Sequence, residues 1–260
     1  MLQRGQAQPH VYASDIEKVK IPLPHKTAQD KIIKEITEIE QKEKAERERV
    51  TKLITQREIR INSLVNQSET TTISKIGVIK GGKRVPKGYK LLSTQTDYPY
   101  IRVTDFNNGT VLMSDLKYIN ETTFNMISRY TINSDEIYIS IAGTIGLVGI
   151  IPQELNGKSL TENAAKIVII DKSKYDYRFL YYVFTSEFVQ EQIRERTKAV
   201  GVPKLALKRI ETILIPKIDI TEQRKVIAEL EHMETEIKII ETYLTNIDNE
   251  KEQILKKYLE

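Results

Sequence analysis

The sequence predicts an α+β fold in which one domain with a mostly antiparallel, twisted sheet is flanked by two long helices that form an antiparallel coiled coil. Three observations support this prediction: the distribution of helix-breaking and aromatic residues, an internal repeat, and a heptad pattern. Prolines are absent between Pro24 and Pro86 and after Pro216. All five phenylalanines and ten of the thirteen tyrosines lie between Tyr89 and Phe188. Two helix-compatible segments therefore flank an aromatic-rich centre that is typical of a mixed domain.

The two flanks are copies of one another. The segment PHVYASDIEKVKIPLPHKTAQDKIIKEI, from Pro9, aligns without a gap with PKLALKRIETILIPKIDITEQRKVIAEL, from Pro203, at a constant offset of 194. Ten of the 28 positions are identical, where composition alone would give roughly two. Each copy contains Ile-Pro, then a turn, then Thr27 or Thr221 at the start of a long helical run. We expect each of these threonines to be the N-cap of a long helix.

Both helical runs carry a heptad seam. Apolar residues in the second copy recur at alternating steps of four and three residues, and the offset of 194 transfers this register to the first copy, where Glu43, Glu46, Arg57 and Arg60 make the seam partly polar. Two matching seams favour an antiparallel helix pair that acts as a spacer, and the alternative is a solvated helix packed on its own domain by one stripe. The predicted interface residues are Ile32, Ile36, Ile39, Val50, Leu53, Leu64, Leu230, Met233, Ile237, Ile240, Leu244, Ile247 and Ile254.

Short β-rich runs alternate with turns between the two helices. We predict strands at 100–103, 136–141, 147–151 and 165–170, a turn at Asn107-Asn108-Gly109, and one amphipathic helix from Arg178 to Arg196. The chain then divides into four parts. These are a stub at 1–24 that resembles the end of a preceding domain, a first coiled-coil helix at 25–68, the central domain at 69–220 and a second coiled-coil helix at 221–260.

The basic charge of the central domain is concentrated in one stretch. No acidic residue lies between Glu69 and Asp97, but six basic residues do, although the whole chain has a net charge of only +4. The glycines of the loop from Lys80 to Gly88 allow a close approach of the backbone, and its basic side chains suit phosphate or guanine contacts. An ordinary basic surface loop is the alternative interpretation.

Sequence signatures of catalysis are missing. The chain has no cysteine, its three histidines (His10, His25 and His232) are scattered, and it contains no Walker A loop, no G-x-G-x-x-G and no Asn-Pro-Pro-aromatic motif. We therefore predict a non-catalytic protein with no cofactor and no metal site. The lack of cysteine and of an apolar signal segment predicts a cytoplasmic location and no membrane span.

These features together resemble the specificity subunits of type I restriction–modification systems. The repeated unit (Ile-Pro, turn, Thr-x-Gln, heptad helix) is similar to their conserved regions. The centre is similar to their target recognition domains at Tyr100-Ile-Arg-Val-Thr-Asp105, at Ile141-Ala-Gly-Thr-Ile-Gly146 and at the junction from Gly201-Val-Pro to Ile213-Leu-Ile-Pro216. The family's full subunit has two target domains, each of which reads half of a split DNA sequence. Because this chain has both helices but one such domain, the resemblance implies a half-size subunit.

The resemblance also implies partners and DNA contacts. They are double-stranded DNA, methyltransferase (modification) subunits, the motor–nuclease (restriction) subunit and a second copy of the chain, which would give a symmetric reader of an interrupted inverted repeat. Phosphate contact by Arg84 predicts that Arg84→Ala weakens binding and flattens its salt dependence. The predicted DNA-binding residues are Lys80, Lys83, Arg84, Lys87, Arg102, Thr104, Asn107, Asn108, Thr144 and Lys198.

Three other interpretations remain open at this point. The chain could be a coiled-coil scaffold that presents an α+β domain to another protein, with no role in DNA binding. It could be a self-sufficient methyltransferase or nuclease, which the missing motifs disfavour. It could also be the product of a degenerate specificity gene, which the intact heptads of the second helix disfavour.

Overall fold

A computed structural model describes residues 12–197 and 203–259 of the chain. The chain divides into two compact units, one formed by residues 1–52 and 236–260 and the other by residues 53–235. Two long helices, α2 (Lys26–Gln67) and α7 (Ile220–Leu259), contribute to both units. Helices and mostly antiparallel strands make up the remainder, so the predicted α+β class with a pair of long helices is confirmed. No helix in the described ranges is both long and apolar enough to cross a membrane.

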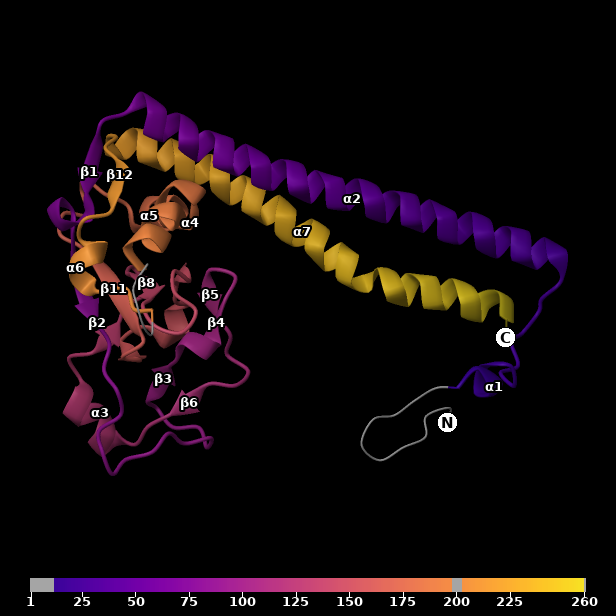
Figure 1. Cartoon of the computed structure of the whole chain (residues 1–260), viewed down its shortest axis with the longest axis horizontal. Helices are drawn as coiled ribbons and strands as arrows, with labels where there is room; N and C mark the ends of the chain where they lie inside the picture. Colours follow the sequence, from indigo (N-terminus) through magenta and orange to yellow (C-terminus); the bar gives the residue numbers. More distant parts are fainter. Residues whose placement is uncertain (1–11, 198–202, 260) are drawn as a thin grey trace. The chain divides into compact units, whose positions relative to one another are not determined.

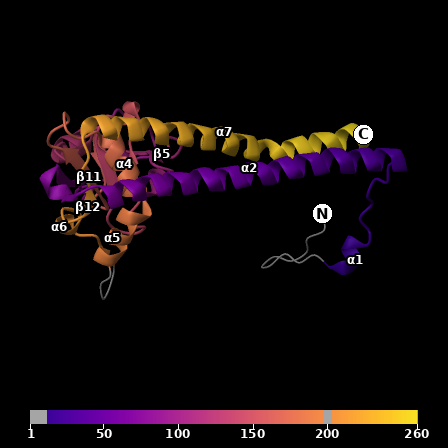
Figure 2. The same cartoon turned by 90° about the horizontal axis from the view of Figure 1, so that it is seen from above.

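The first unit contains a short helix, α1 (Ala13–Ile16), and the paired parts of α2 and α7. Lys257 donates to Glu35 with an Nζ–Oε1 distance of 3.1 Å, and Arg49 pairs with Glu236. Residue numbers thus fall along one helix as they rise along the other. The two helices run antiparallel and side by side, as Figure 1 and Figure 2 show.

In this unit the heptad positions of both helices are buried or half-buried, whereas most positions between them are exposed. Ile237, Ile240 and Ile247 are the buried apolar residues of α7 here. A polar pair also lies on the seam, where Lys251 Nζ donates to Glu43 Oε2 at 3.0 Å. This charged pair across the seam favours the observed register, because a shift of one turn would separate the two partners.

The second unit is built around two four-stranded sheets. The first has the order β2 (Gly77–Gly81), β11 (Ala164–Ile169), β8 (Ile137–Ser140), β9 (Val148–Ile150) and is antiparallel throughout. The second has the order β6 (Lys117–Tyr118), β3 (Pro99–Ile101), β10 (Lys158–Leu160), β7 (Thr131–Ile132), and only its β3–β10 pair is parallel. Two further antiparallel pairs are β1 (Thr70–Thr72) with β12 (Leu214–Pro216), and β4 (Phe106–Asn107) with β5 (Thr110–Val111).

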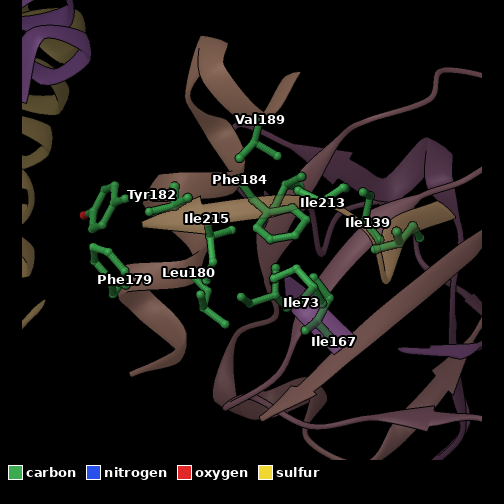
Figure 3. Close-up of a cluster of buried hydrophobic side chains, with 14 of the residues drawn as sticks. Ile73, Ile139, Ile167, Phe179, Leu180, Tyr182, Phe184, Val189, Ile213 and Ile215 are labelled. Carbon is green, nitrogen blue, oxygen red and sulfur yellow. The ribbon is translucent and has the colours of Figure 1, made fainter. Parts of the chain in front are cut away.

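Helices cover this β structure and enclose its main core. They are α3 (Glu121–Ile127), α4 (Tyr177–Thr185), α5 (Glu187–Thr197) and α6 (Leu207–Ile210), with 3₁₀ helices at Ile73–Lys75, Val103–Asp105 and Gln153–Leu155. Phe179, Phe184 and Val189 of α4 and α5 belong to one buried cluster with Ile139 and Ile167 of the first sheet, and Figure 3 shows Phe184 at its centre. Leu64 of α2 and Leu230 of α7 belong to the same buried cluster. The domain core thus includes the adjoining turns of both long helices.

A second apolar layer lies between the two sheets. It includes Ile101 of β3 and Leu160 of β10 from one sheet, and Tyr138 of β8 and Ala164 of β11 from the other. Alternate side chains of β8 and β11 therefore enter different cores, because neighbouring residues of a strand point to opposite faces. This burial on both faces explains why the two strands are mostly apolar. The charged exception, Lys166 of β11, donates to Glu136 Oε2 at 2.8 Å.

The four predicted strands are found within one or two residues of their expected bounds, but the predicted helix from Arg178 to Arg196 is wrong in one respect. It is two helices, α4 and α5, separated at Ser186. The backbone of Ser186 is extended (ψ 153°), and its hydroxyl donates to the Val183 carbonyl at 2.6 Å. A serine that bonds the preceding turn in this way interrupts a helix that periodicity alone would continue.

The predicted threonine N-caps are also wrong, since both helices begin before the threonine. In α7 the cap is Asp219, whose Oδ1 accepts from the backbone N–H groups of Thr221 (2.8 Å) and Glu222 (3.0 Å). In α2 the carbonyl of His25 accepts the first helical hydrogen bonds, and Thr27 lies inside the first turn. His25 and Asp219 occupy the same repeat position, so the two copies differ at the capping position.

Candidate nucleic-acid interface

Three of the predicted DNA-binding residues line one hollow of about 460 Å³ on the central domain. The parallel pairing of β3 with β10 explains why they meet, because the carboxyl ends of parallel strands lie at the same edge. Arg102 follows β3 there, Glu162 follows β10, and the loop after β2 brings Arg84 to the same place. The lining residues are Arg84, Val85, Tyr89, Leu91, Tyr100, Arg102, Val103, Thr104, Thr161, Glu162 and Asn163.

The backbone of the basic loop is held tightly at its start. A Cβ on Gly82 would lie 2.1 Å from the carbonyl oxygen of Thr161, so only glycine allows this approach. Next to it, the Lys83 N–H donates to the Leu160 carbonyl at 2.9 Å. The carbonyl of Lys83 accepts from the buried Tyr100 hydroxyl at 2.8 Å. The chain is thus fixed at the residue before Arg84.

The side chain of Arg84 is held by a carboxylate. Its Nε donates to Glu162 Oε1 at 2.6 Å, and Glu162 Oε2 accepts from Thr161 Oγ1 at 3.0 Å. Glu162 Oε2 also lies 3.2 Å from the Tyr100 hydroxyl, whose single proton it shares with the Lys83 carbonyl. Glu162 raises the pKa of Arg84 through this hydrogen bond. Burial opposes ionisation of Glu162, but hydrogen bonds led by that from Arg84 outweigh it and lower the pKa of Glu162. Burial raises the pKa of Tyr100 to about 12. Tyr100 thus stays a hydrogen-bond donor at neutral pH.

Arg102 also lines the hollow, but its guanidinium is already engaged. Nε and Nη2 both donate to Asp105, with an Nη2–Oδ1 distance of 2.5 Å, and Nη2 also donates to the Asp115 carbonyl at 2.8 Å. Asp105 is buried, and its hydrogen bonds raise the pKa of Arg102. The structure therefore places Arg102 as a brace for the 3₁₀ turn Val103–Asp105, beside the exposed Thr104.

Asn107 and Asn108 lie at the tip of the β4–β5 hairpin, and both are exposed. Asn108 (φ 45°) and Gly109 (φ 77°) adopt the left-handed conformations that a tight two-residue hairpin turn needs, so the predicted turn is confirmed. A Cβ on Gly109 would lie 2.2 Å from the Tyr181 hydroxyl oxygen. At the base of the hairpin the Phe106 ring stacks on a tyrosine of β8 with centroids 3.8 Å apart. The tip is therefore a polar projection with a fixed base.

The predicted lysines are distributed over the same region. Lys80 is exposed but lies within β2, so it is not part of the loop in which the sequence placed it. Lys83 is exposed, and its Nζ lies 5.6 Å from the centre of the Tyr130 ring. Lys87 is exposed in the loop that follows.

Thr144 lies exposed in the turn between β8 and β9, flanked by Gly143 and Gly146 with positive φ. The Ser140 hydroxyl donates to the Thr144 carbonyl at 2.6 Å and fixes the turn. Thr144 is not among the residues that line the hollow. Lys198 lies outside the described residues.

Glu162 and Tyr100, the two residues that organise the hollow, were not among the predicted DNA-binding residues. The signal of Glu162 was weak, because a single acidic residue is most simply interpreted as a solvated surface charge. Tyr100 was noted only as part of a segment that resembles the family. The polar triplet Thr161-Glu162-Asn163 between two buried strands was the available indication. Within the described residues, no group of three or more histidine or acidic side chains could hold a metal ion.

Comparisons with known proteins agree on one family. The family model described as the type I restriction modification DNA specificity domain matches residues 66–251. The specificity subunit of the type I restriction enzyme EcoBI from Escherichia coli is 25% identical over 204 residues, which are 76% of this chain and 40% of that protein. The chain thus spans less than half the length of this curated relative.

Two solved structures share the fold. The S subunit of a type I restriction-modification system from M. genitalium superposes with a TM-score of 0.60 at 17% identity, over 100% of this chain and 68% of that one. The HsdS subunit from Thermoanaerobacter tengcongensis gives a TM-score of 0.57 at 16% identity, over 98% and 64%. At these identities the likeness concerns the fold alone.

Proposed function

The chain belongs to the type I restriction modification DNA specificity domain family. We propose that it reads one half of a bipartite DNA site and that it docks methyltransferase subunits at this site. The observation that carries the proposal is the family match over the whole central domain, which contains the hollow with its basic and polar lining. The chain itself supplies recognition and no catalysis in this proposal. The motor–nuclease subunit completes the restriction complex.

The contacts with DNA divide into positioning and reading. Lys80, Lys83 and Lys87 are exposed lysines on β2 and on the loop that follows it, and they suit phosphate contacts because an ammonium group can approach a phosphate from any direction. Asn107 and Asn108 present amide groups at a projecting tip, which suits contact with adenine edges. Thr104 and Thr144 are further exposed hydroxyl groups in this proposal, and Lys198 remains a predicted contact.

A second copy of the chain would supply the second recognition domain. Support comes from apolar side chains of the first unit that stand in solvent: Ile16 is 59% exposed, Ile21 77% and Leu23 81%. In the second repeat the equivalents of the two isoleucines, Ile210 and Ile215, are fully buried. α1 and α6 occupy identical repeat positions. The first copy therefore forms the same short helix as the second, but its apolar side chains are not covered by other residues that the structure describes. We propose that residues 12–24, within the stub at 1–24, are covered in a homodimer.

The paired helices at 25–68 and 221–260 hold the two recognition domains apart and provide the docking face for the methyltransferase. Their antiparallel register is fixed by ion pairs, which suits a spacer of constant length. A twofold dimer would present the same face twice, which matches two methyltransferase subunits.

Sequencing of the methylated bases in a host that carries the intact system tests the proposal. A symmetric dimer predicts methylation within an interrupted inverted repeat, which disappears when this gene is deleted. A non-palindromic split motif that depends on this gene alone contradicts the homodimer. If the purified chain with its methyltransferase retains no DNA in a filter-binding assay, the DNA-reading proposal fails and the scaffold interpretation gains support.

A further inference from the structure

We propose that Arg84 is a base-reading residue that recognises a guanine in the major groove, and that Glu162 is the residue that positions it. This inference rests on the proposed DNA-reading function and names a specificity determinant within it. It also changes the role expected of Arg84, which the sequence placed among phosphate contacts. Four features of the hollow support it.

The first feature is the rigidity of the backbone that carries Arg84. Gly82 lies against the Thr161 carbonyl at a distance that no other residue permits, and Lys83 is bonded through both its N–H and its carbonyl. A side chain that reads a base edge must be held within a fraction of an ångström of the productive position. A side chain that contacts a phosphate has no comparable requirement, because the charge interaction has little directionality.

The second feature is the orientation of the guanidinium. Glu162 Oε1 accepts from Nε at 2.6 Å, and the other oxygen of Glu162 is held by Tyr100 and Thr161, which are both buried. Each link in this chain of contacts is thus fixed by the next. The side chain of Arg84 is nevertheless 77% exposed. It is therefore both oriented and accessible.

The third feature is the set of donors that remains. Within the described part of the chain, the hydrogen bonds of Arg84 use Nε and leave Nη1 and Nη2 available. Two parallel donors at the end of a planar group match the O6 and N7 acceptors of guanine, which is the commonest specific contact of arginine with DNA. Arg102, the other arginine of the hollow, has its Nε and Nη2 engaged by Asp105 and Asp115.

The fourth feature is the charge of Glu162. A carboxylate 2.6 Å from Arg84 offsets much of the attraction of this arginine for a phosphate and would itself be repelled by one. It does not reduce the number or direction of the free Nη donors. The pair is poorly suited to phosphate binding and well suited to a neutral base edge.

The experiment uses the complex of the full chain with its methyltransferase and a duplex library that is randomised across the site. Bound DNA is sequenced for the wild type, Arg84→Lys and Glu162→Gln. Arg84→Lys keeps the charge but loses the bidentate fork, so the preference for G·C at one position of each half-site should fall about tenfold. Glu162→Gln should reduce the same preference less, with other positions unchanged. The melting temperature of each variant verifies folding.

The matched controls are Arg194→Lys and Glu187→Gln, which alter an exposed arginine–glutamate pair on α5. They should leave every base preference unchanged. A phosphate role for Arg84 predicts a different result, namely uniformly tighter binding of Glu162→Gln to all sequences, because a negative charge is removed. That result, or wild-type base preferences in Arg84→Lys, overturns the inference while the proposed function stands. If the wild-type complex selects no motif, the proposed function fails and the inference fails with it.

Discussion

At the scale of single residues, the positions of the side chains proposed to read bases depend on Gly82 and Gly109, whose backbones touch their neighbours. Gly109 closes the β4–β5 hairpin with φ 77° and lies against Tyr181 of α4. Burial raises the pKa of Tyr181 to about 12, so its hydroxyl stays protonated at neutral pH. This contact with α4 fixes the position of the hairpin tip, which carries Asn107 and Asn108.

Gly109→Ala should therefore lower the free energy of unfolding by more than the strain of the left-handed backbone alone would cause. Gly143→Ala is the matched control, because Gly143 has φ 76° and nothing lies within 4 Å of its would-be Cβ. The control should cost about 1–2 kcal/mol from the left-handed conformation. Gly109→Ala should exceed it by about 1–2 kcal/mol because Tyr181 must move from its packed position. Urea unfolding of both variants measures the difference, and equal values would show that the contact with Tyr181 is unimportant.

At the scale of elements, the cap of α7 shows how the repeat both helped and misled. The repeat correctly indicated two long helices and their register. It directed attention to the shared Thr221, however, whereas the cap is Asp219, which corresponds to His25 in the other copy. The hydrogen bonds that the backbone donates to its carboxylate, led by that from Glu222, lower the pKa of Asp219.

Asp219→Ala should therefore lower the urea midpoint, and Thr221→Ala should change it much less. Asp219→Asn should retain part of the effect, because its carbonyl oxygen can accept the same bonds. Since the pKa of Asp219 is lowered on folding, its ionic contribution is present above the unfolded value and is lost as the pH falls through the folded value. The difference between wild type and Asp219→Ala should thus shrink as the pH falls below about 4. A larger loss in Thr221→Ala would instead restore threonine as the cap.

At the scale of the whole molecule, the unpaired apolar side chains of residues 12–23 are the observation that bears on assembly. Each chain has a mass of 30.0 kDa, so analytical ultracentrifugation should find the wild type at twice this value. Ile21→Ser with Leu23→Ser should shift the equilibrium towards the monomer, because exposed apolar area is then no longer buried on association. Ile170→Ser is the control, since Ile170 is 63% exposed on the central domain. A monomeric wild type at every concentration contradicts the homodimer.

The sequence predicted the architecture well because periodicity and repeats record it directly. The strands, the hairpin turn at Asn107-Asn108-Gly109 and the helix pair all depend on local patterns. The hollow could not be predicted in the same way, since Arg84 and Glu162 are 78 positions apart and meet through the pairing of β2 with β11. No sequence-spacing rule identifies the carboxylate that will orient a given arginine.

The pairing of β1 with β12 has a consequence for how such a protein can change. Thr70 lies opposite Pro216 and Thr72 opposite Leu214, so the polypeptide enters and leaves the central domain at adjacent points. Everything between 73 and 213 is in effect an insertion between two neighbouring strands, and insertions with close ends are well tolerated. Exchange of this block for another would leave the sequence of both long helices unchanged, provided that the new block packs on Leu64 of α2 and Leu230 of α7 as this one does. Under the proposed function, such an exchange would change the DNA sequence that is read while both long helices are kept.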